Sequence, residues 1–198
     1  LSQAVKRTGV AVVQESHVRN RKRGALRRWA IKNGFTVFRT RTRRGRLGGL
    51  IIFTKDFLRK YVPQHNDILP GYVHSVTLRE RREGVAYGPV LGSVTNLYFS
   101  AQSSSVRVWQ IKKVADYMAE NGYGAGGRID YAAGDLNFIE SLADHWSRTA
   151  EGNFRCGEDD HQRLGPEAKA WAENMRMRVG FEEVWQPIPT LCGTNKSF

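Results

Sequence analysis

A carboxylate, an amide–phenol pair and an acid–amide pair stand in this sequence where each could hold a cation or a water molecule. Glu15 comes after Gln14 and after Val10–Val13, a short apolar run typical of a buried strand. A carboxylate at the end of a strand is fixed in position and can bind a divalent cation. The simpler interpretation of Glu15 by itself is a surface residue in a turn.

Asn96 and Tyr98 are two residues apart in segment 91–99, which is predicted to be a strand. Side chains of a strand repeat every two residues, so these two would share one face. An amide and a phenol that point the same way can bind an anionic oxygen or orient a neighbouring carboxylate. The alternative is a pair on an edge strand that faces water.

Asp135 and Asn137 follow a predicted strand at 129–133 and flank Leu136. Gly134 allows the backbone to turn sharply where that strand ends. The acid and the amide can then face one cavity while Leu136 enters the core, and together they could orient and deprotonate a water molecule. The alternative is an ordinary Asx turn.

Hydrophobic spacing and stop signals predict the elements that must position these groups. Helices are expected at 2–8, 24–33, 104–121 and from Pro166 onward. The last of these has an apolar stripe of Ala168, Trp171, Ala172, Met175 and Val179. Strands are expected at 10–13, 35–41, 47–54, 72–78, 91–99, 129–133 and 181–185. The polar stretch 144–164 is predicted to be an irregular insertion.

This order of elements favours an α/β (α+β) fold. Because helices separate only some of the strands, the chain fits either two sheets packed face to face with helices outside or one mixed sheet. Its 198 residues suffice for a single domain spanning 1–198, or for most of one. The first residue is Leu1 rather than Met, which suggests a piece of a longer chain.

The charge distribution indicates a polyanionic partner. Lys and Arg total 31 against 19 acidic residues, a net charge of +12. The stretch from Arg19 to Arg46, here called the basic block, holds twelve cations and no acid, so it alone carries +12. Such a block repels itself unless an anion offsets its charge. The residues predicted to contact nucleic acid are Arg19, Arg21, Lys22, Arg23, Arg41, Arg43, Arg44 and Arg46.

The alternatives for the basic block are a solvated face or a membrane surface, although Leu26, Trp29 and Ile31 are its few apolar anchors. No apolar run approaches the roughly 20 residues of a membrane span. Cys156 and Cys192 are too few for a disulfide framework, and together with His161 they match no common zinc-site spacing. We expect an intracellular protein with reduced thiols.

In combination and in this order, the motifs resemble those of the endonuclease/exonuclease/phosphatase superfamily. That superfamily includes abasic-site endonucleases, pancreatic deoxyribonuclease and the endonuclease domains of non-LTR retrotransposons. The resemblance covers about residues 11 to 185. It rests on the Gln-Glu strand end at 12–16, the glycine pair at 46–52, the Asn-x-Tyr strand at 94–99 and Gly-Asp-Leu-Asn-Phe at 134–138. The last motif combined with Gln-Glu is the most specific.

The resemblance implies two packed mixed sheets flanked by helices, a four-layer sandwich, and a role for each candidate residue. Glu15 would be the principal ligand of Mg²⁺, with Mn²⁺ as a possible substitute. Asp135 would orient and deprotonate the attacking water, and Asn137 would hold that water. Tyr98 would stabilise charge on the phosphate oxygens, and Asn96 would support the site from beside the metal.

The sequence also departs from the family pattern. The family's first strand, with an Asn near the metal, would precede Leu1, and its terminal Ser-Asp-His would follow Phe198. The fold is therefore expected to be incomplete at the first strand and at the C-terminal strands. With the catalytic His absent, residues 1–198 are expected to be weakly active or inactive. His145 imitates the Ser-Asp-His motif but comes too soon after Asp135, and is interpreted as a loop residue.

Three functions remain open from the sequence. The leading hypothesis is a Mg²⁺-dependent DNA-nicking endonuclease of the retrotransposon or abasic-site type. It would be a monomeric domain, alone or as part of a larger polyprotein, and nuclear if it derives from a retrotransposon. The second keeps the fold but acts on inositol phosphates or phospholipid head groups. The third is a non-catalytic nucleic-acid-binding remnant.

Overall fold

The computed structural model describes residues 2–14, 16, 22–41, 47–84, 86–138, 146–148, 154–156 and 165–182. Its helices are α1 (Ser2–Thr8), α2 (Arg23–Lys32), α3 (Lys55–Leu58), α4 (Ser104–Glu120) and α5 (Pro166–Trp171), which continues into a π-helical turn at Ala172–Arg176. Its strands are β1 (Val10–Val13), β2 (Phe35–Arg41), β3 (Leu47–Thr54), β4 (Tyr61–Leu69), β5 (Val73–Glu80), β6 (Val90–Tyr98), β7 (Ile129–Asp135), β8 (Trp146–Arg148) and β9 (Phe154–Cys156).

Two sheets form the centre of the molecule. The first has the strand order β1-β3-β2 and is antiparallel, with Val13 opposite Leu50. The second has the order β4-β5-β6-β7 and is antiparallel except between β6 and β7, which run parallel. Strands β8 and β9 form a separate two-stranded ribbon. The resemblance implied that both sheets would be mixed, but among the described strands only the second is.

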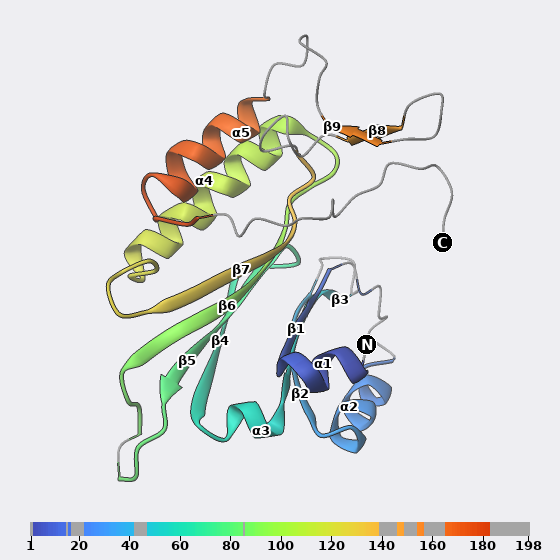
Figure 1. The fold of residues 1–198 in the computed structure, drawn as a ribbon, viewed down its shortest axis with the longest axis vertical. Helices are drawn as coiled ribbons and strands as arrows, with labels where there is room; N and C mark the ends of the chain where they lie inside the picture. Colours follow the sequence, from blue (N-terminus) through green and yellow to red (C-terminus); the bar gives the residue numbers. More distant parts are fainter. Residues whose placement is uncertain are drawn as a thin grey trace.

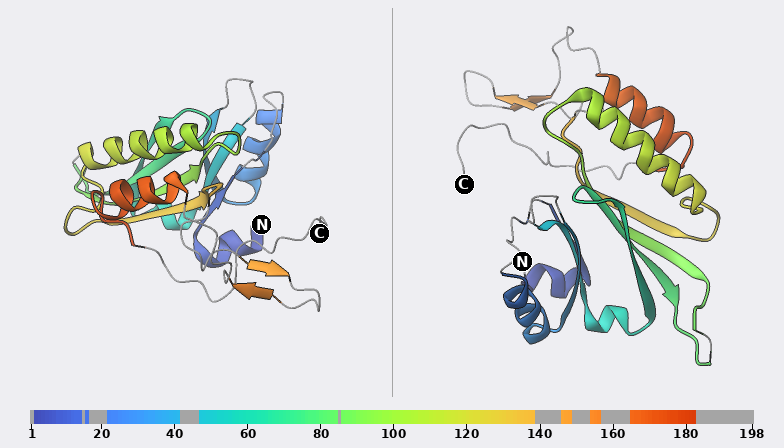
Figure 2. Two further views of the ribbon diagram at one scale, coloured as in Figure 1. Left: turned by 90° about the horizontal axis from the view of Figure 1, so that it is seen from above. Right: turned by 180° about the vertical axis from the view of Figure 1, so that it is seen from behind.

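The two sheets pack face to face, and helices cover both outer faces. Helices α1 and α2 lie on the first sheet, and α4 and α5 on the second, as Figure 1 and the two views of Figure 2 show. The continuous apolar run of β3 contributes side chains to the cores on both faces of its sheet. Ile51 and Phe53 point into the core between the sheets, while Leu50 and Ile52 point towards α1 and α2. The predicted four-layer sandwich is therefore confirmed.

Helix α4 contributes to the core on the other side of the molecule. Its Ile111, Val114 and Met118 are fully buried in one cluster with Leu97 of β6 and with Phe99, which follows that strand. The predicted stripe of the C-terminal helix is confirmed at Ala168, Trp171, Met175 and Val179, but it includes Ala170 in place of the half-buried Ala172. Among the described residues no helix is long and apolar enough to cross a membrane.

Several predicted elements differ from those observed. Strand β4 was missed because its centre is polar and because it contains Pro63. An edge strand tolerates this proline, since the N–H that proline lacks would face outwards. Helix α3, capped by the Thr54 hydroxyl, was also missed. Strand β7 continues to Asp135, two residues beyond the prediction. Phe181 and Glu182 are not in a strand, and 183–185 lie outside the described residues. The predicted insertion 144–164 contains β8 and β9.

Candidate active site at the ends of three strands

The side chain of Asn96 joins the two sheets where β1 ends. Its Nδ2 donates to the Val13 carbonyl (2.9 Å) and to the Leu50 carbonyl (3.1 Å), and its Oδ1 accepts from Nε2 of Gln14 (3.3 Å). Asn96 is completely buried. The resemblance gave Asn96 a supporting role beside a metal. The structure shows a fully used amide that fixes the last residues of β1 against β6.

The glycine pair that opens β3 allows this close approach. A Cβ atom on Gly49 would lie 2.5 Å from Nδ2 of Asn96 and 3.2 Å from Nε2 of His74. A Cβ atom on Gly48 would lie 2.5 Å from the Gly71 carbonyl oxygen in the β4–β5 turn. Any side chain at either position would push the sheets apart. The pair is therefore a requirement of inter-sheet packing at this end of the sandwich.

Tyr98 and Asp135 are neighbours at the ends of β6 and β7. The parallel pairing places Asn96 opposite Ala133 and Tyr98 opposite Asp135. Because both strands alternate, Asn96, Tyr98 and Asp135 lie on the face that looks towards the first sheet. Leu136 packs instead into the core beneath α4, as predicted. Tyr98 and Asp135 are both half-buried, so solvent and a ligand can reach them.

The loop after β7 fixes the acid–amide pair. The backbone N–H of Asn137 donates to Oδ1 of Asp135 (3.0 Å), so the Asx turn named as the alternative is present. Asn137 adopts a positive φ of 55°, which asparagine tolerates better than most residues. Its Nδ2 donates to the Phe99 carbonyl (2.7 Å), and the Phe99 N–H donates to the Asp135 carbonyl (3.0 Å). The turn thus orients the Asp135 carboxylate, and Nδ2 of Asn137 holds the loop against the residue that follows β6.

Glu15 lies outside the described residues, so the predicted pairing of Glu15 with Asp135 around one cation stays a prediction. Both chain neighbours of Glu15 are held at this end of the sandwich. Gln14 contacts Asn96, and the N–H of Ser16 donates to the Gly48 carbonyl (3.1 Å). Among the described residues, no three His, Cys, Asp or Glu side chains gather as a metal site. The donors that do meet there are carboxylate and amide oxygens, which suit Mg²⁺ or Mn²⁺.

A pair of histidines below the site was not predicted. His74 lies opposite Asn96 in the sheet and is completely buried, with Nδ1 3.0 Å from Nε2 of His65. Burial, together with the smaller effect of the neighbouring His65, lowers the pKa of His74 to about 3. The pKa of His65 is also lowered by burial, against the opposing charge of Asp67. No sequence signal marks this pair, because a single His in an alternating strand is ordinary.

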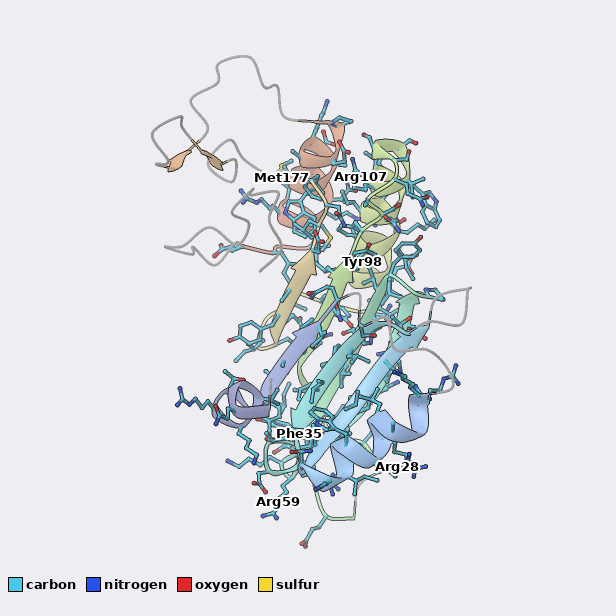
Figure 3. All side chains as sticks on the ribbon, turned by 90° about the vertical axis from the view of Figure 1, so that its right-hand side faces the viewer. Arg28, Phe35, Arg59, Tyr98, Arg107 and Met177 are labelled. Carbon is cyan, nitrogen blue, oxygen red and sulfur yellow. The ribbon has the colours of Figure 1, made fainter. Side chains whose placement is uncertain are left out.

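The part of the basic block from Lys22 to Lys32 lies on the outer helical layer. Helix α2 buries Ala30 and packs Leu26 and Trp29 on the first sheet. The exposed cations on this helix and at its start, here called the α2 cations, are Lys22, Arg27, Arg28 and Lys32. Arg28 is labelled in Figure 3 on the helix surface. Of the remaining predicted contacts, Arg23 begins α2 and is half-buried.

Arg41, the last residue of β2, pairs with Leu47 beside the glycine pair, at the same end of the first sheet as the candidate site. Its side chain lies outside the described part of the chain. The five remaining predicted contacts lie wholly outside it: Arg19, Arg21, Arg43, Arg44 and Arg46. A hollow of about 530 Å³ lies along β7 and is lined by residues such as Arg128, Asp130 and Phe181. None of the candidate catalytic residues lines it, so we do not assign the chemistry to it.

No protein-family model matches this sequence, and no curated protein matches it. Among solved structures the chain is similar to ANGEL2, a 2′,3′-cyclic phosphatase, in complex with adenosine-2′,3′-vanadate, with 16% identity and a TM-score of 0.49. That match covers 72% of this chain and 44% of that one. The chain is also similar to truncated TDP2 of Caenorhabditis elegans, with 13% identity, a TM-score of 0.45 and coverage of 70% and 54%. It spans about half the length of these proteins.

The motifs of this sequence resemble those of the endonuclease/exonuclease/phosphatase superfamily. The layers, the strand order and the hydrogen bonds described above are observed in this chain itself. They show a four-layer α+β sandwich in which the Asn-x-Tyr strand and the Gly-Asp-Leu-Asn-Phe motif end side by side. This is the fold and the placement of motifs that the sequence resemblance to that superfamily implies.

Proposed function

We propose that this chain is a divalent-metal-dependent phosphoesterase that cleaves nucleic acid, with DNA nicking as its reaction. The observation that carries the proposal is the meeting of three strand ends at one edge of the sandwich. Gln14 after β1 contacts Asn96, and Tyr98 of β6 lies opposite Asp135 of β7. These are the residue types that hydrolysis of a phosphodiester by an activated water requires.

Each side chain has a part in this proposal. The Asp135 carboxylate, oriented through its bond to the Asn137 N–H, would accept a proton from the attacking water. The Asn137 carbonyl oxygen would hold that water in line with phosphorus. The Tyr98 phenol, beside Asp135, would donate a hydrogen bond to a phosphate oxygen. Glu15, between two anchored neighbours, would hold Mg²⁺, or Mn²⁺ in its place, and the bound cation would offset charge on the phosphate.

The charge of the chain supports nucleic acid over a small phosphate ester. A net charge of +12 with a block of twelve cations exceeds what a single phosphate head group needs. The α2 cations are exposed on a helix that carries no acid, so they can contact several backbone phosphates at once. Phosphate contacts give affinity and register but no choice of sequence.

A plasmid-nicking assay tests the proposal. The natural polypeptide that contains this chain is incubated with supercoiled plasmid and Mg²⁺, with and without chelator, as wild type and as Asp135→Asn. The matched control is Asp116→Asn. It makes the same chemical change on α4, where Asp116 forms an exposed ion pair with Arg178. We expect the chelator to abolish nicking, Asp135→Asn to lower the rate by about 10²-fold or more, and the control to have no effect.

The two other functions predict different outcomes. Release of phosphate from inositol phosphates without nicking would support the small-molecule enzyme and contradict the proposal. Tight binding of the plasmid without cleavage by any form of the protein would support the non-catalytic alternative. Equal rates for Asp135→Asn and wild type would remove Asp135 from the mechanism.

A further inference from the structure

An exposed aromatic ring continues the candidate site outward. Tyr72, in the turn between β4 and β5, stacks on Tyr98 with ring centroids 6.2 Å apart and planes inclined by only 8°. Tyr72 remains 38% exposed. Tyr98, labelled in Figure 3, lies at the end of β6 beside Asp135. The two parallel rings therefore form a stack that begins at the proposed catalytic phenol and ends at solvent.

The turn that carries Tyr72 is held firmly by the first sheet. The N–H of Gly71 donates to Oγ1 of the buried Thr40 (2.8 Å), and the N–H of Tyr72 donates to the Leu69 carbonyl (2.8 Å). Gly48 packs directly against Gly71. A ligand that stacks on Tyr72 would thus meet a preorganised ring, since the backbone beneath it is already ordered. Binding to such a surface loses little conformational entropy.

We propose that Tyr72 stacks on an unpaired nucleobase next to the phosphate that is cleaved, so that it determines the choice of substrate. This inference rests on the proposed function and narrows it. A flat aromatic ring parallel to a second ring is suited to a third flat π-system, which every nucleobase offers and an inositol ring lacks. Within a duplex both faces of a base are covered by its neighbours. The base must therefore come from a single strand or be flipped out.

Binding without hydrolysis tests this inference. The chain is titrated, in chelator, into a single-stranded oligonucleotide that carries 2-aminopurine, and into an oligonucleotide of equal length built from abasic spacers. Because stacking of one base on an aromatic residue contributes about 1–3 kcal/mol, Tyr72→Ala should weaken binding of the first oligonucleotide about 5- to 150-fold. It should leave binding of the spacer strand unchanged, and it should abolish quenching of 2-aminopurine.

Two further variants and a control make the result decisive. Tyr72→Phe keeps the ring and should bind as wild type does. Tyr72→Leu keeps apolar bulk without a π-face, should fold even where the alanine variant does not, and should lose the quenching. Tyr87→Ala removes another exposed tyrosine, which is 67% accessible and lies beneath the Arg79 guanidinium, and it should change neither measurement.

The stacking inference and the proposed function can fail separately. Equal affinity of wild type for the base-containing and spacer strands, or unchanged quenching in Tyr72→Leu, would overturn the stacking even if Asp135→Asn abolishes nicking. Loss of quenching in Tyr72→Leu, with nicking unaffected by Asp135→Asn, would instead support the stacking and contradict the assigned catalysis.

Discussion

The contact between Gly49 and Asn96 makes a quantitative prediction about how the two sheets are joined. Gly49→Ala places a methyl group 2.5 Å from Nδ2 of Asn96, so we expect overpacking to cost about 1–3 kcal/mol. Asn96→Ala leaves the carbonyls of Val13 and Leu50 without this donor. The Leu50 bond is buried and the Val13 bond is partly buried, so the loss should be about 2–4 kcal/mol.

The double variant distinguishes this explanation from two independent losses of stability. Once Asn96 is alanine, the 2.5 Å contact of the methyl group at position 49 is removed and the 3.2 Å contact with Nε2 of His74 remains, so the second change should cost less than it does in wild type. We expect the double variant to be about 1–2 kcal/mol more stable than the sum of the single changes. Urea denaturation of the four proteins measures this coupling. Gly126→Ala, where a Cβ atom meets nothing within 4 Å, is the control and should be neutral. If instead the costs of the two single changes add to within about 0.5 kcal/mol, the proposed contact between Gly49 and Asn96 as a link between the sheets is refuted.

Three other outcomes follow from the same contacts. Because burial lowers the pKa of His74 to about 3, the unfolded chain takes up a proton on this histidine between pH 7 and pH 5, whereas the folded chain does not. The free energy of unfolding should therefore fall by about 2 kcal/mol over that range, and His74→Gln should remove that part of the loss in urea titrations. Glu167→Ala removes the carboxylate partner of the half-buried Arg107, which keeps its bond to the Ser100 carbonyl, and should cost about 1–3 kcal/mol in thermal or urea unfolding. Asp116→Ala, at an exposed pair, should cost less than about 1 kcal/mol. If about six phosphates are contacted, log affinity against log salt should slope near −5, and replacing Arg27 and Arg28 with glutamine should reduce the slope by about 2; a flat response contradicts duplex binding.

Sequence reasoning located most of the fold because burial on both faces leaves a readable pattern. The β2 and β3 strands were predicted to the residue, since the alternating pattern of β2 and the apolar run of β3 end at clear turn signals. β4 was missed because an edge strand that is half open to solvent needs few apolar residues, and Tyr61–Leu69 has polar residues at its centre. Its existence is fixed by pairing with β5, which a local pattern does not contain.

The candidate site was predicted in part. The residue types and their places at strand ends were predicted, whereas the atoms that they bind were not. The motifs indicated that Asn96, Tyr98, Asp135 and Asn137 would lie at strand ends, and they do. The sequence does not say which atoms each amide binds, because those atoms belong to segments distant in the chain. The contact of Tyr72 with Tyr98 likewise depends on how the β4–β5 turn meets the first sheet.

Loss of activity would have different meanings at positions 96 and 135. Asn96 is buried and bonded to three groups, so removing its side chain changes the stability of the sandwich and the position of the end of β1 together. A slow Asn96→Ala variant would therefore say little about chemistry unless its stability were restored independently. Asp135→Asn keeps an oxygen for the Asn137 N–H and so preserves the turn while it removes the charge. If Asp135→Asn unfolds at the same urea concentration as wild type but does not cleave, the loss must be assigned to the carboxylate itself.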